Sequence, residues 1–194
     1  MISRRMQVII SLIVLILIGL ALGEIVKLKH KAESVQSVTD ARPELPQPSG
    51  GSVNAYQADD ATGTLKNVPL NVPPGGDDGE RLKAILQALI NSYTAKNSPH
   101  PLAQGAGIHA VYLLKDNSAL VDLNAAFVDG HPSGINCEQL TIFSIVETLV
   151  ANQPQLLRVR FLVDGKPRAT LAGHASLTDF YETAAVTQAV KDMQ

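Results

Sequence analysis

Residues 136–165, NCEQLTIFSIVETLVANQPQLLRVRFLVDG, decide the fold expected of this chain, because a helical pattern passes directly into a strand pattern. After Asn136, apolar side chains recur at helical spacing and make this the most apolar, central helix of the domain. Asn136 and Gln139 resemble a capping box that begins the helix. Residues 156–163 alternate apolar and basic side chains as a strand does, and Asp164-Gly165 predicts a type I′ hairpin turn.

Other strand and helix patterns surround this stretch. Asp77 or Asp78 can cap a helix that continues to residue 93, and its apolar residues form one face. The remaining expectations are hairpins over 53–57 with 64–70 and 108–114 with 119–124, a return strand over 168–172, and a short or frayed helix within 181–194. This order predicts an α+β domain in which two helices pack on one face of a mostly antiparallel sheet.

The N-terminal residues predict a membrane segment. Arg4 and Arg5 precede an apolar run over 8–23 in which Ser11 is the one polar residue. About 20 apolar residues span a bilayer, so residues 6–26 predict a single transmembrane helix. The alternative is a signal peptide cleaved near residues 21–23. With the N-terminus inside, the rest of the chain is extracytoplasmic (periplasmic), and it is secreted if the segment is cleaved.

The chain therefore divides into four parts. Residues 1–23 are the N-terminal anchor or signal segment, and residues 24–52 are a linker rich in Pro, Gly and Ser. Residues 53–180 form the folded domain, and residues 181–194 are a C-terminal tail. After residue 23 the chain holds 14 basic and 18 acidic residues, a net charge of −4, because Arg4 and Arg5 are the only charges before Glu24. This balance argues against nucleic acid as a partner.

Several segments together resemble the GerMN (sporulation and spore germination) family. The stretch ALVDLNAAF at 119–127 is similar to the family's VDLS..F segment, and the helix over 140–149 also fits. VRFLVDGKP at 159–167 is similar to V.FLVDGKP, and LAGH at 171–174, followed by Leu177, matches L.GH..L. The resemblance covers about residues 53–180. The chain departs from better-known members in carrying one copy of the domain and no lipobox cysteine.

The resemblance implies a fold like the α+β modules that build rings in secretion-type assemblies. It also implies an extracytoplasmic domain of the bacterial cell envelope, linked to sporulation, cell-wall processes and complex assembly, in a family for which no enzymatic activity is established. The expected function is a non-enzymatic interaction module tethered to the membrane, which binds envelope proteins, itself or peptidoglycan. The alternative is a peptidoglycan-acting hydrolase or its accessory protein.

No constellation of catalytic, cofactor-binding or metal-binding residues stands out. His131 and Cys137 are the one pair that suggests a metal site, and a site needs three or four ligands. The single cysteine excludes an intramolecular disulfide, and Cys137 is expected to be a half-buried small residue. His174 is expected to bond backbone at the end of the sheet, with a surface contact as the functional alternative.

The remaining polar candidates also have structural interpretations. Ser144 lies mid-helix without the context of a nucleophile, and the glycines at 105 and 107 precede no helix that could hold a phosphate. A glycosidase needs two carboxylates roughly 5–10 Å apart. The candidates for such a pair are spread along the chain: Asp122, Asp129, Glu138 and Glu147.

Overall fold

The computed structural model describes residues 51–194, and this part of the chain begins with an antiparallel hairpin of β1 (Ser52–Asp59) and β2 (Thr64–Asn71). The Asp59 carboxylate accepts the backbone N–H groups of Ala61 and Thr62 and so shapes the turn. The expected transmembrane segment over 6–26, and nearly all of the linker, lie outside the described residues. No helix within residues 51–194 is long and apolar enough to cross a membrane.

The next element is the helix α2 (Asp78–Tyr93), which begins where the sequence predicts. Asp77 is its N-cap, and the Asp77 side chain accepts the Glu80 N–H at 2.9 Å. One face of the helix is buried, as the spacing of its apolar residues requires. The buried residues are Leu82, Ile85, Leu86, Leu89, Ile90 and Tyr93.

A second, four-stranded sheet has the order β3-β4-β5-β6, with β3 (Ile108–Leu113), β4 (Ser118–Leu123), β5 (Arg158–Val163) and β6 (Tyr181–Glu182). The α+β class is confirmed, but the described residues form two sheets and four helices rather than one sheet and two helices. In addition, β4 and β5 are parallel. A helical crossover connects these neighbours, and such a crossover returns the chain in the same direction.

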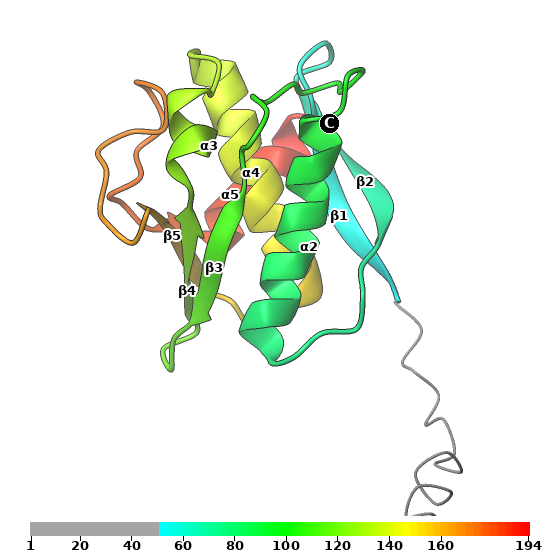
Figure 1. The fold of residues 1–194 in the computed structure, drawn as a ribbon, viewed down its shortest axis with the longest axis vertical. Coiled ribbons are helices and arrows are strands. Elements are labelled where there is room, and N and C mark those ends of the chain that lie inside the picture. Colours follow the sequence, from blue (N-terminus) through cyan, green and yellow to red (C-terminus); the bar gives the residue numbers. More distant parts are fainter. Residues whose placement is uncertain (1–50) are drawn as a thin grey trace, which may run out of the picture. The chain divides into compact units, whose positions relative to one another are not determined.

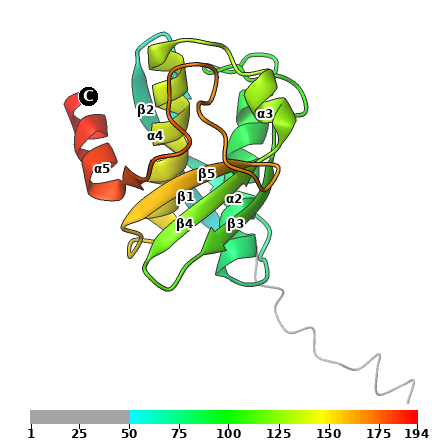
Figure 2. The same ribbon diagram turned by 90° about the vertical axis from the view of Figure 1, so that its left-hand side faces the viewer.

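The crossover contains the short α3 (Ala125–Asp129) and the long α4 (Ile135–Asn152). Figures 1 and 2 show α2 and α4 between the four-stranded sheet and the β1–β2 hairpin. The Thr148 hydroxyl on α4 accepts the Tyr56 N–H of β1 at 2.9 Å. Because α4 is covered from two sides, it is buried around most of its circumference from Glu138 to Leu149, and its role as the central helix is confirmed.

The beginning of α4 differs from the expected capping box. The N-cap is Gly134, without a side-chain cap, and Asn136 lies in the first turn. The N–H of Gly134 instead donates to Glu138 at 3.2 Å. A local pattern at Asn136 and Gln139 is therefore overridden by a buried carboxylate.

The Asp164-Gly165 turn is confirmed, with φ of +48° and +72°, but the return strand over 168–172 is wrong. Pairing after the turn ends with a bridge between Val163 and Lys166, and Pro167, which lacks an N–H, follows. The chain then forms a loop up to β6. Finally, α5 (Thr183–Asp192) packs on α4 and buries Val186 and Val190, so the helical alternative for the tail is confirmed.

Candidate functional site

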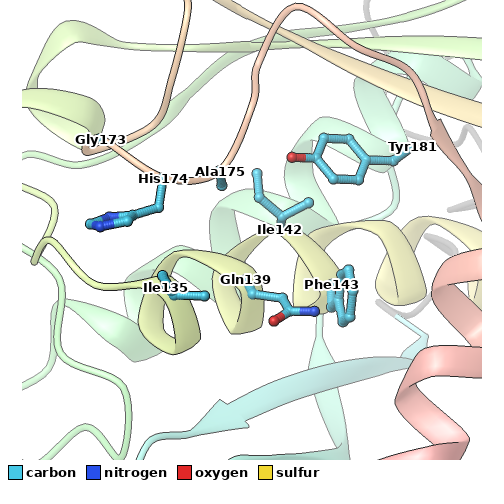
Figure 3. Close-up of a pocket in the computed structure, with 8 residues that line it drawn as sticks. All are labelled: Ile135, Gln139, Ile142, Phe143, Gly173, His174, Ala175 and Tyr181. Carbon is cyan, nitrogen blue, oxygen red and sulfur yellow. The ribbon is translucent and has the colours of Figure 1, made fainter.

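An apolar groove of about 630 Å³ lies between the first half of α4 and the loop after β5. Figure 3 shows Ile135, Ile142 and Phe143 along α4, facing His174 and Tyr181 across the opening. Ile135 is 65% exposed, which is high for a large apolar side chain. The groove therefore presents apolar surface to solvent at a position that the loop and the helix define together.

A buried carboxylate, Glu138, holds that loop against α4. Its Oε2 accepts the backbone N–H groups of Ala172, His174 and Ala175 at 2.9–3.0 Å, and its Oε1 accepts His174 Nδ1 at 2.8 Å. Burial by itself would raise the pKa of Glu138, but the hydrogen bonds from His174 and the three backbone amides outweigh it and bring the pKa down to about 2. Gly173, at φ +121°, allows the sharp turn that aims these amides at one oxygen.

The expectation for His174 is therefore wrong about its partner. The imidazole bonds the Glu138 carboxylate rather than backbone, and 43% of the His174 side chain remains exposed at the groove. The sequence offers no signal for this pairing, because 36 residues separate the two positions.

A surface lined by the aromatic residues Phe143, Phe180 and Tyr181 extends the groove towards α5. A second hollow of about 300 Å³ shares Phe143 and Tyr181 with the first and adds Phe180. Phe180 is 36% exposed, and the guanidinium of Arg158 lies 4.5 Å from its ring centre. The Tyr181 hydroxyl donates to the Ser176 carbonyl, and burial raises the pKa of Tyr181 to about 12, so it remains a donor.

The pair suggested by sequence, His131 and Cys137, is brought together and gains a third member, His100. One ligand atom from each of the three side chains lies within 4.8 Å of the others. His100 comes from the long connection after α2 and is fully buried. Burial raises the pKa of Cys137 to about 11, which keeps the thiol protonated, and its half-buried placement is confirmed.

The structural interpretation of Ser144 is confirmed. It is fully buried, and its hydroxyl lies 2.5 Å from the Tyr93 hydroxyl, which in turn accepts the Ala58 N–H. The loop containing Gly105 and Gly107 is followed by the strand β3 rather than by a helix.

Each carboxylate considered for a glycosidase pair has a separate structural partner. Asp122 accepts the Gly165 N–H at 2.8 Å, and Asp129 pairs with Arg168. Glu147 accepts the Thr187 hydroxyl on α5, and Glu138 holds the loop after β5.

A family model described as "Germane: Sporulation and spore germination" matches residues 54–169. No curated protein matches the chain. Similar solved structures include a candidate lipoprotein of Clostridium perfringens, with 20% identity, a TM-score of 0.48, and coverage of 71% of this chain and 89% of that one.

Two structures of the sporulation protein GerM of Bacillus subtilis are also similar, each with 16% identity. The tandem GerMN domains have a TM-score of 0.49 and coverage of 68% of this chain and 46% of that one, so this chain spans less than half of the tandem. The first GerMN domain has a TM-score of 0.46, with coverage of 66% and 92%.

Proposed function

Since the chain belongs to the Germane family of sporulation and spore germination domains, we propose that it is a non-enzymatic interaction module of the bacterial cell envelope. Residues 6–26 tether it to the cytoplasmic membrane, and the folded domain is extracytoplasmic. In this position it contributes to the assembly of an envelope or cell-wall-related complex, in the manner of a ring-building module.

The observation that carries the proposal is the apolar groove between α4 and the loop after β5. Its volume of about 630 Å³ is that of a site which accepts one or two large side chains of a partner. Its walls are preformed, because Glu138 fixes the loop and α4 belongs to the core. A rigid apolar pocket with a polar rim is the usual centre of a protein–protein interface.

We assign the groove to an apolar segment of another envelope protein. Ile135 is exposed in the groove and Phe180 in the adjoining hollow, so a segment that occupies both would cover both side chains. His174 on the rim offers a hydrogen-bonding ring, and beside Phe180 lies the guanidinium of Arg158, which also pairs with Asp116 at 2.8 Å. The combination favours a peptide that carries an aromatic or aliphatic anchor next to acidic or polar residues.

Photo-crosslinking in cells tests this assignment. A photoreactive amino acid is placed in the full chain at Ile135 or Phe180, and at Tyr112 as the control. Tyr112 is 50% exposed on β3 and does not line the groove. Crosslinks to one envelope protein from both groove positions and not from Tyr112 support the proposal.

Other outcomes overturn part or all of it. Crosslinks from Tyr112 alone would move the interface to the edge of the sheet, and crosslinks between copies would make the partner the chain itself. Retention on isolated peptidoglycan without any protein crosslink would make the wall the ligand. Release of soluble fragments from peptidoglycan by the purified full chain would refute the non-enzymatic assignment.

A further inference from the structure

Three side chains from separate segments converge below the first turn of α4: His100, His131 and Cys137. His100 is fully buried and His131 is 7% exposed, whereas Cys137 is half-buried. We propose that these three side chains bind a divalent metal ion such as Zn²⁺, with Nε2 of each histidine and the Cys137 sulfur as ligands. Imidazole and thiolate are the ligands that zinc prefers in proteins.

The strongest argument comes from the other nitrogen of each ring. Nδ1 of His100 lies 2.6 Å from a carboxylate oxygen of Asp60, and Nδ1 of His131 lies 2.7 Å from the carbonyl oxygen of Pro132. Metal-binding histidines commonly donate that second N–H to a carboxylate or a backbone carbonyl, which fixes the tautomer and aims the free nitrogen. Both rings here have this arrangement.

The two Nε2 atoms are aimed at the same point, which the Thr141 hydroxyl occupies. The distances are 2.6 Å from His100 and 2.7 Å from His131. Thr141 lies one helical turn after Cys137, so both side chains are on the same face of α4. We infer that the hydroxyl fills the position of the metal when no metal is bound.

The number of available hydrogens shows that the Thr141 hydroxyl cannot satisfy both histidine rings. Both Nδ1 atoms face acceptors and therefore carry hydrogen, while Thr141 has a single hydrogen for two ring nitrogens and the Cys137 carbonyl at 3.1 Å. The single hydroxyl hydrogen therefore cannot be donated to both rings at once.

Metal binding requires the three ligand side chains and Thr141 to move slightly. In a tetrahedral zinc site the ligand atoms lie roughly 3.5 Å apart, and here they lie within 4.8 Å of one another. Rotation of the Thr141 side chain frees the centre and leaves the fourth position to water. Because zinc binds the thiolate, binding releases the thiol proton, and zinc affinity should fall as the pH is lowered.

The test uses the full chain, purified in detergent, kept reduced and freed of metal with a chelator. Titration with Co²⁺ should give a thiolate-to-cobalt charge-transfer band, and Zn²⁺ should abolish that band by displacement. Zinc should also raise the temperature of unfolding. Absence of the band, together with no shift of the unfolding temperature by zinc, would overturn the proposal.

Four variants separate the ligands from their surroundings. Cys137→Ala, at a half-buried position, should lose the charge-transfer band, and Asp60→Asn should weaken zinc binding roughly 10–100-fold. Thr141→Val should bind zinc more tightly, because no hydroxyl competes for the ring nitrogens. His109→Gln is the control, since His109 is exposed and outside the cluster. Equal zinc binding by Cys137→Ala and the control would place the metal elsewhere and refute this site.

Discussion

Replacement of Glu138 by glutamine should loosen the loop after β5 and lower stability in a pH-dependent way. The pKa of Glu138 is about 2 in the folded protein, against an ordinary value of 4.5. This difference corresponds to about 3 kcal/mol of stability at neutral pH. Because the folded-state pKa is the lower one, the stabilisation is present above pH 4.5 and is lost as the pH falls towards 2.

The measurement is urea unfolding of a fragment of residues 48–194, which contains all the described helices and strands, followed by far-ultraviolet circular dichroism at pH 7 and pH 3. Other carboxylates titrate identically in both proteins and cancel in the difference between wild type and Glu138→Gln. The variant should be less stable by about 3 kcal/mol at pH 7, and this deficit should shrink by about 2 kcal/mol at pH 3.

Two results would refute the reasoning. An equal deficit at both pH values would mean that Glu138 contributes by shape and not by charge. Absence of any deficit at pH 7 would mean that the four hydrogen bonds from the loop to this carboxylate do not hold the loop.

Three further changes test other parts of the structure. Asp77→Ala removes the N-cap of α2 and should cost about 1 kcal/mol in urea unfolding, whereas an unchanged midpoint would exclude the cap. Gly165→Ala introduces a side chain at φ +72° and should cost about 1 kcal/mol, and a stabilised variant would contradict the left-handed turn. Ile135→Glu, at a position 65% exposed, should abolish crosslinks from a photoreactive residue at position 180 while the unfolding temperature stays unchanged, and intact crosslinks would refute its role.

The elements with strong local signals could be predicted from the sequence. The hairpins rest on alternating side chains and turn residues, and α2 rests on its apolar stripe and its Asp77 cap. The apolar character of α4 also indicated a central position. The sequence of α4 did not reveal that two separate sheets cover it. A helix that is buried on all sides has the same apolar sequence pattern whether sheets or other helices pack against it.

The errors arose where distant residues decide the local structure. The strand expected over 168–172 is absent, since pairing ends before Pro167 and Glu138 accepts the backbone N–H of Ala172. Two members of the candidate metal cluster, His131 and Cys137, could be identified from the sequence. Its third member, His100, lies more than 30 residues earlier in a loop, and no spacing rule connects it with the other two.

The position of β1 determines how the domain responds to mechanical load. The chain before Ser52 continues directly into the open end of the hairpin, where Ser52 is paired with Asn71. A pulling force applied through that segment acts on one pair at a time, from the open end towards the turn, as in the opening of a zipper. Because the Tyr56 N–H of β1 donates to Thr148 on α4, opening the hairpin also pulls directly on the central helix, whereas β2 is the one described strand with which β1 pairs.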